Sequence, residues 1–296
     1  MKTVECHLAL DQKIVLLLGD IGVYGFRNAF NNYPSRVFNI GILEPATMSL
    51  ASGLAKTELI PIIHTIAPFL VERSFEQLKV DFGYQCLGGN FISVGASYDY
   101  ASLGCTHHCP GDVGILMNVP GIEIVIPGTS AEFDALFQQT YANGHPTYYR
   151  LSERENQTTQ AVHFGKANVV KEGSRATVIA VGPALQHVLP AVEDMDVGVL
   201  YYSTVAPFDY KTLVDNLAPC GKILLVEPFY SGTLSHEVCK AVHPKPIAID
   251  TVGVPREFLT HYGRADEHDK YIGLDAENIR TKLEKMINDK SINIDT

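Results

Sequence analysis

Short apolar segments of strand-like composition alternate along the chain with segments of helical periodicity, and this alternation is the strongest constraint on the fold. In the first half, strand-like segments lie at residues 13–18, 37–42, 59–65, 90–94 and 122–126, and helical segments at 45–55, 69–84 and 130–143. Strands that are apolar throughout are buried on both faces, as in parallel sheets. We therefore predict an α/β fold of mostly parallel sheets flanked by helices.

A polar stretch divides the chain into two such units. Residues 152–171 are rich in charged, amide and hydroxyl side chains. In the second unit, strands are predicted at 176–181, 197–201, 222–227 and 246–251, and helices at 184–193, 210–217, 235–243 and 276–287. A chain of 296 residues is long enough for two ordinary domains. We predict a first domain over residues 1–155, a linker over 156–172 and a second domain over 173–296.

Composition excludes several classes of function. The formal net charge of −10 argues against binding to nucleic acid or to an anionic membrane surface. No uncharged apolar run approaches the roughly 18 residues of a membrane span, and the first residues carry no signal-peptide pattern. The six cysteines are scattered, which is typical of reduced thiols in a cytoplasmic protein. These features suit an enzyme that acts on small molecules in the cytoplasm.

One acidic residue stands at a distinctive place in the first unit. Glu44 ends the apolar run 39–43 and directly precedes a helix that opens with Pro45 and continues in small residues. Proline is tolerated in a first helical turn because its missing N–H has no partner there. A carboxylate at this place either caps the helix by accepting backbone N–H groups or is held for chemistry.

Two clusters of polar residues add candidates for chemistry. Residues 105–109 read Cys-Thr-His-His-Cys, but adjacent histidines point apart and the spacing matches no usual zinc pattern, so we predict no metal site. Arg150 and Arg154 flank a Leu-Ser-Glu segment. Either arginine could hold a phosphate through a bidentate contact, and either could equally be a solvated linker charge.

Nearly the whole chain resembles the C-terminal portion of transketolases and related thiamine diphosphate enzymes. Four segments carry this resemblance, residues 41–44, 65–73, 104–108 and 146–152. The resemblance implies a pyrimidine-binding domain followed by a transketolase C-terminal domain. It also implies thiamine diphosphate and Mg²⁺ as cofactors, with the protein supplying binding, geometry and proton transfer.

The resemblance also implies roles for residues that contact the cofactor. Glu44 matches the catalytic glutamate, which hydrogen-bonds the aminopyrimidine ring and so supports removal of a proton from the thiazolium ring. Phe69 matches the aromatic that stacks on the aminopyrimidine, and Ile66 stands where the family often has a second phenylalanine. Asp20 lies in a turn expected near the cofactor. Arg73, by contrast, is expected only to form a helix ion pair with Glu76 or Asp81.

Other residues are implied to meet the substrate. His107 matches a histidine that faces the substrate, with His108 beside it, and a near-neutral pKa suits such a role. Arg150 and Arg154 are the candidates for a substrate phosphate. Asp112 is expected to orient one of the histidines or to cap a helix. Leu103 stands where many transketolases have an acidic residue, which predicts a different donor sugar.

The family motif for the metal is missing. Transketolases bind the diphosphate through a divalent ion held by a Gly-Asp-Gly motif and a downstream Asn, and the sequence contains no such motif. We therefore predict one subunit of a split enzyme. An N-terminal transketolase subunit would hold the diphosphate and Mg²⁺, and two copies of each chain would form an α2β2 heterotetramer.

These features predict a transferase that is active only with its partner subunit. It would move a two-carbon ketol unit from a ketose or ketose phosphate to an aldehyde-type acceptor. The alternatives are the beta subunit of a 2-oxo acid dehydrogenase, an enzyme similar to deoxyxylulose-phosphate synthase, and a non-catalytic scaffold.

Overall fold

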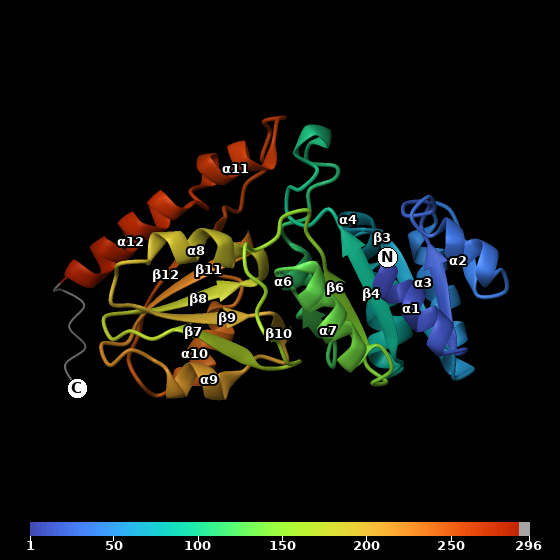
Figure 1. Ribbon diagram of the computed structural model, residues 1–296, viewed down its shortest axis with the longest axis horizontal. Helices are drawn as coiled ribbons and strands as arrows, with labels where there is room; N and C mark the ends of the chain where they lie inside the picture. Colours follow the sequence, from blue (N-terminus) through green and yellow to red (C-terminus); the bar gives the residue numbers. More distant parts are fainter. Residues whose placement is uncertain (290–296) are drawn as a thin grey trace.

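Two sheets stand side by side in the molecule, each covered by helices (Figure 1). The computed structural model describes residues 1–289, so positions 290–296 of the predicted second domain lie outside the described residues. The first sheet has seven strands in the order β10-β5-β6-β4-β3-β1-β2, and the second has five in the order β12-β11-β8-β9-β7. The predicted α/β fold with two mostly parallel sheets is confirmed.

Most elements fall where the alternation predicts them. The strands are β1 Ile14–Leu18, β2 Val37–Asn39, β3 Ile60–Ile66, β4 Gly89–Val94, β5 Glu123–Val125, β6 Pro146–Arg150, β7 Ala167–Lys171, β8 Thr177–Val181, β9 Gly198–Tyr202, β10 Thr204–Ala206, β11 Lys222–Tyr230 and β12 Ala248–Val254. The helices are α1 Lys2–Leu10, α2 Arg27–Asn32, α3 Glu44–Lys56, α4 Ala67–Val71, α5 Phe75–Gln77, α6 Asp112–Leu116, α7 Ser130–Thr140, α8 Leu185–Ala191, α9 Tyr210–Asp215, α10 Ser235–Val242, α11 Ala265–Ile272 and α12 Ala276–Asn288.

The strands are apolar throughout because helices cover both faces of each sheet. All five residues of β1 are buried. Leu16 belongs to a core cluster that includes Phe137 of α7, whereas Leu17 belongs to a second cluster that includes Met48 of α3. Successive side chains of a strand point to opposite faces, so a doubly covered strand needs apolar residues at every position.

The second domain donates a strand to the first sheet. Strand β10 pairs antiparallel with β5, with Thr204 opposite Val125, and so forms the edge of the seven-stranded sheet. The second core cluster likewise joins Ile124 of β5 to Leu200 of β9. The two domains therefore share a sheet edge and a core rather than only a tether.

Two local predictions are wrong. Residues 167–171, placed in the linker, form strand β7, which pairs antiparallel with β9 at the edge of the second sheet. The helix predicted over 69–84 is broken, with α4 and α5 separated by a short turn and followed by a π-helical segment, Leu78–Tyr84. Ser74 contributes to the break because its hydroxyl donates to the carbonyl of Phe69 at 3.2 Å, in competition with helical backbone bonds.

Candidate active site at the carboxyl edge of the first sheet

Most of the predicted site residues follow the carboxyl ends of neighbouring parallel strands. Strands β1 to β4 run parallel, so the loops that leave them gather at one edge of the sheet. Asp20 follows β1, Glu44 follows β2, Ile66 ends β3, and His107 lies in the long loop after β4. Ligands of open α/β sheets bind at this edge.

Glu44 is the first residue of α3 and is only 3% exposed. Its Oε2 accepts a hydrogen bond from Nη1 of Arg73 at 2.7 Å, whereas its Oε1 is buried without any partner among residues 1–289. Within the same residues neither oxygen accepts a backbone N–H, so the helix-cap alternative is wrong. A buried carboxylate oxygen without a donor is costly, and it marks a place prepared for one.

The apolar residues next to Glu44 in the sequence differ in exposure. Met48 is fully buried, whereas Ile42 and Leu43 are 65% and 57% exposed. Ile42 and Leu43 are therefore open to solvent on this chain.

Phe69 joins Glu44 to the histidine loop. Its ring lies edge-on to that of His107, with 5.4 Å between the centroids, and the guanidinium carbon of Arg73 lies 4.1 Å from its centroid. His107 is partly exposed, and its Nδ1 is 3.0 Å from the hydroxyl of Thr106. The structure thus brings the predicted catalytic glutamate, stacking ring and substrate histidine into one cluster.

Arg73 is a member of this cluster that the sequence reasoning assigned wrongly. It pairs with Glu44 and not with Glu76 or Asp81, and Asp81 accepts instead from the hydroxyl of Ser49 at 2.6 Å. Its position four residues after Phe69, in a segment with helical periodicity, was a signal for its contact with the Phe69 ring but not for its pair with Glu44.

Asp20 and Ile66 lie on the rim of the cluster. Asp20 is exposed, and its backbone N–H donates to Oδ1 of Asn39, which also accepts from the backbone N–H of Gly41. Asn39 thereby ties the turn after β1 to the turn before Glu44, a role that the sequence did not reveal. Ile66 borders Gly95, where an added Cβ would lie 2.5 Å from the ring of Tyr100. The close ring and the positive φ of Gly95 (+73°) favour glycine at this position.

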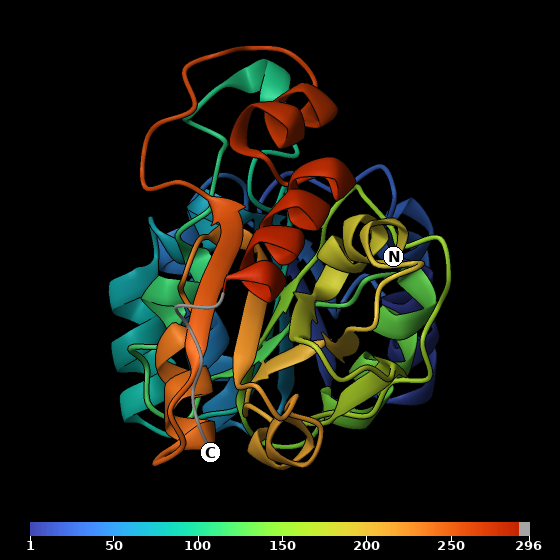
Figure 2. The ribbon, with the colours of Figure 1, turned by 90° about the vertical axis from the view of Figure 1, so that its left-hand side faces the viewer.

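His108 points away from His107, as expected for adjacent residues. It is 7% exposed, its Nε2 has no partner within the described part of the chain, and its ring meets that of His268 in α11 at 5.7 Å. Burial, followed by the neighbouring His268, lowers the pKa of His108. In Figures 1 and 2 its loop and α11 project together beside the sheets. His108 braces this projection and does not line the cluster.

Arg150 is held in a buried network. It is 1% exposed, its Nε donates to Oδ2 of Asp112 at 2.7 Å, and one of its Nη atoms donates to Ser97 at 2.8 Å. Tyr148 donates to the same carboxylate oxygen at 2.8 Å. Asp112 therefore orients an arginine and neither histidine. The predicted phosphate contact of Arg150 conflicts with this geometry because almost none of its side chain is accessible.

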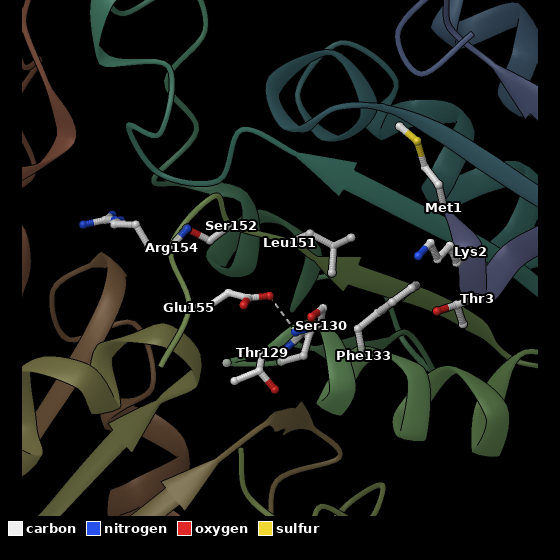
Figure 3. Close-up of a pocket in the computed structure, with 12 residues that line it drawn as sticks. Met1, Lys2, Thr3, Thr129, Ser130, Phe133, Leu151, Ser152, Arg154 and Glu155 are labelled. Atoms are coloured by element: carbon white, nitrogen blue, oxygen red, sulfur yellow. Dashed lines mark hydrogen bonds between the residues drawn. The ribbon is translucent and has the colours of Figure 1, made fainter. Parts of the chain in front are cut away.

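Arg154 also has protein partners. Its Nη1 donates to both oxygens of Asp269 in α11, at 2.6 and 2.7 Å. Arg154, Leu151 and Ser152 border a cavity of about 370 Å³ between α1 and α7, shown in Figure 3, where the guanidinium of Arg154 points away from the other labelled side chains. Glu155 instead reaches the backbone N–H of Ser130 at the start of α7, 2.8 Å away. A phosphate contact would require Arg154 to leave this ion pair.

Two sequence matches decide the family. The transketolase pyrimidine-binding domain matches residues 3–158, and the transketolase C-terminal domain matches residues 165–279. The chain belongs to the transketolase family. The order of its domains is the one that the sequence predicted, and the family implies dependence on thiamine diphosphate.

Relatives of similar length agree with this membership. A 33.6 kDa protein of the fasciation locus of Rhodococcoides fascians is 36% identical over 288 residues, which cover 96% of this chain and 92% of that protein. One subunit of the apulose-4-phosphate transketolase of Phocaeicola vulgatus is 29% identical, covering 85% of this chain and 84% of the relative. The predicted C-terminal subunit of a split transketolase is confirmed.

A solved structure shares the fold. A split-gene transketolase, described as an inactive beta4 tetramer, superposes with a TM-score of 0.85 over 99% of this chain and 96% of the other, at 23% identity. At this identity the match concerns the fold alone.

The cluster of Glu44, Phe69 and His107 fits the aminopyrimidine half of thiamine diphosphate. The ring needs a carboxyl group and an aromatic face, which the unpartnered Oε1 of Glu44 and the ring of Phe69 would supply. Within residues 1–289, no group of three or more His, Cys, Asp and Glu could hold a metal ion. In the same part of the chain, no helix is long and apolar enough to cross a bilayer.

Proposed function

We propose that this chain is the subunit of a two-chain transketolase that supplies the aminopyrimidine half of the active site. The reaction transfers a two-carbon ketol unit from a ketose or ketose phosphate to an aldehyde-type acceptor. The observation that carries the proposal is the buried, unpartnered Oε1 of Glu44 beside Phe69 and His107. Thiamine diphosphate, when bound, supplies the acidic carbon that takes up the two-carbon unit.

Each residue of the cluster has a task in this scheme. Glu44 Oε1 holds a proton at the aminopyrimidine, in a site that excludes water because the side chain is 3% exposed. Phe69 positions the ring by offset stacking, worth about 1 kcal/mol beyond its buried area. His107 is partly exposed, so it can exchange a proton with hydroxyl or carbonyl oxygens of the substrate. Asp20 and Ile66 border the cofactor.

The partner subunit supplies the diphosphate and Mg²⁺ site. This proposal rests on the missing Gly-Asp-Gly motif and on the exposed apolar residues around Glu44. Ile42, Leu43 and Leu50 are 65%, 57% and 47% exposed, and such a patch next to a site indicates a protein interface. Two copies of each chain would form an α2β2 heterotetramer. The six cysteines are unpaired, in keeping with a cytoplasmic enzyme.

The substrate is proposed by class only. The relative from Phocaeicola vulgatus is named for a ketose phosphate, which favours a donor with a distal anionic group. Because Arg150 and Arg154 are held by Asp112 and Asp269, other groups would contact that anion. The partner subunit can supply them.

Reconstitution tests the proposal. The chain is co-expressed with a candidate N-terminal transketolase subunit that carries Gly-Asp-Gly and a downstream Asn, and the complex is titrated with thiamine diphosphate and Mg²⁺. Saturable binding is expected, followed by ketol transfer from ketose phosphates to aldehydes. A complex that binds no thiamine diphosphate contradicts the proposal, as does a Glu44→Ala complex with full turnover.

Two further assays separate the enzymatic alternatives. A 2-oxo acid with an artificial electron acceptor reports the beta subunit of a dehydrogenase. Pyruvate with glyceraldehyde 3-phosphate reports chemistry like that of deoxyxylulose-phosphate synthase. Turnover in either assay, without ketol transfer, would replace the proposed reaction.

A further inference from the structure

Arg73 lies over the ring on which the aminopyrimidine would stack, and it pairs with the second oxygen of the glutamate that the aminopyrimidine would contact. Its guanidinium carbon lies 4.1 Å from the centroid of the Phe69 ring, and its Nη1 donates to Oε2 of Glu44 at 2.7 Å. A planar group that lies over this ring and pairs with this carboxylate takes the place that the aminopyrimidine would have under the proposed function. Guanidinium groups are suited to both contacts because they are flat and carry fixed donors.

The side chain of Arg73 can leave this position. It is 41% exposed, whereas the carboxylate that it contacts is 3% exposed. Arg73 belongs to the short turn between α4 and α5, and Glu76, three residues further on, is exposed to solvent. Rotation of the partly exposed arginine toward the exposed Glu76 would exchange the pair with Glu44 for a pair at the surface.

We propose that Arg73 is a stand-in for the cofactor, which covers Phe69 and neutralises Glu44 until thiamine diphosphate displaces it. This inference rests on the proposed function and adds to it a positioning residue that competes with the ligand. It explains how the charge of the buried Glu44 carboxylate is neutralised in a chain whose cofactor site is completed by another protein. The apparent affinity for the cofactor is then lowered by the fraction of molecules in which the arginine lies inward.

A rival role for the same contacts gives the opposite result. If Arg73 were a permanent clamp that orients Glu44 for the cofactor, its removal would weaken binding. The sign of the change therefore decides between the two roles. A partly exposed ion pair is more stable than its separated partners by a few tenths to about 1 kcal/mol. This converts to about a two- to fivefold change in the affinity for thiamine diphosphate.

The test compares thiamine diphosphate binding by complexes that contain wild-type, Arg73→Met or Arg73→Lys chains. Binding is measured by calorimetry in the presence of Mg²⁺, without substrate, so the readout does not depend on turnover. If Arg73 is a stand-in, the dissociation constant of thiamine diphosphate should be about two- to fivefold lower for the Arg73→Met complex than for the wild type. Arg73→Lys keeps the charge but not the flat group, and it should fall between the other two.

A matched control uses Arg27, whose guanidinium lies 4.5 Å from the ring centroid of Tyr24, with no acidic partner among the described residues. Arg27→Met should leave the dissociation constant unchanged. Unchanged or weaker binding by both folded Arg73 variants overturns the inference and leaves the proposed function standing. A wild-type complex that binds no thiamine diphosphate overturns the proposed function and this inference together. Circular dichroism and the melting temperature establish that each variant is folded.

Discussion

Two buried glutamates, one in each domain, have opposite surroundings. Glu227 in β11 is fully buried, and its two oxygens accept backbone N–H groups from Gly232 and Leu234 at 2.6 and 2.8 Å. Glu44 is nearly as buried, yet one of its oxygens has no partner within residues 1–289 and the other meets a partly exposed arginine. Burial alone therefore does not identify a catalytic acid. What sets Glu44 apart is an unpartnered oxygen at the carboxyl edge of the sheet, which leaves one hydrogen bond for a ligand under the proposed function.

The sharpest test of this contrast replaces each acid by its amide. Glu44→Gln removes the proton-holding group and should lower kcat of the reconstituted enzyme by about 10²–10⁴-fold, the range for general acid–base catalysis. Glu227→Gln should retain kcat within a factor of about two, since this residue only ties a loop. Steady-state kinetics of both complexes provide the check. Comparable losses of kcat in the two variants would remove the distinction between the two glutamates.

A second prediction tests whether the buried network around Arg150 stabilises the contact between the two domains. Arg150→Met leaves Asp112 buried and uncompensated, and it removes a hydrogen bond at 3.3 Å to the carbonyl of Pro228 in the second domain. The free energy of unfolding should fall by about 3–5 kcal/mol, as for other broken buried ion pairs.

Urea unfolding measures this change. Arg175, which is exposed, supplies the matched control, and Arg175→Met should shift stability by less than about 0.5 kcal/mol. An Arg150→Met chain as stable as the control would mean that the network contributes nothing to the joint between the domains.

The third prediction concerns pH. Burial raises the pKa of Glu227 from 4.5 to about 8, although its backbone hydrogen bonds oppose the shift. An acid with a higher pKa in the folded state binds more protons when folded, so this carboxyl lowers the free energy of unfolding as the pH rises from about 4.5 to about 8. The full effect is on the order of 5 kcal/mol.

Glu227→Gln cannot titrate, so its stability should decline less between pH 5 and pH 8 than that of the wild type. Urea unfolding at both pH values gives the comparison. Parallel declines in the two proteins would show that other groups set the pH dependence.

The smallest predicted effect concerns the substrate side of the first region. His107→Asn keeps a hydrogen-bonding group but cannot exchange a proton, and it should lower kcat/KM by about ten- to a hundredfold. The melting temperature should stay within about 1 °C because His107 is partly exposed. His145, which is exposed and far along the chain, supplies the control variant His145→Asn. A stability loss without a kinetic defect would make His107 a structural residue like His108.

Local patterns in the sequence were sufficient for the architecture, whereas the centre of the site was predicted from the resemblance to transketolases. Apolar runs such as 14–18 can only be doubly buried strands, and Pro45 fixes the start of the helix that carries Glu44. Because parallel strands place their following loops at one edge, the order of Glu44, Phe69 and His107 along the chain also placed them together. These features follow from the periodicity of the side chains and from the order of strands and helices along the chain.

Only the tertiary structure decided which partner each charged group has. Arg73 meets Glu44 across 29 positions, Arg150 meets Asp112 across 38, and Arg154 meets Asp269 across 115. An arginine in a polar segment has the same local signature whether it binds a phosphate or a distant carboxylate. Strand β10 was not predicted for the same reason, because a strand of three residues is defined by its long-range pairing with β5 and not by a local pattern. The sequence determined which groups reach the edge of the sheet, and long-range packing determined which of them remain free to bind a ligand.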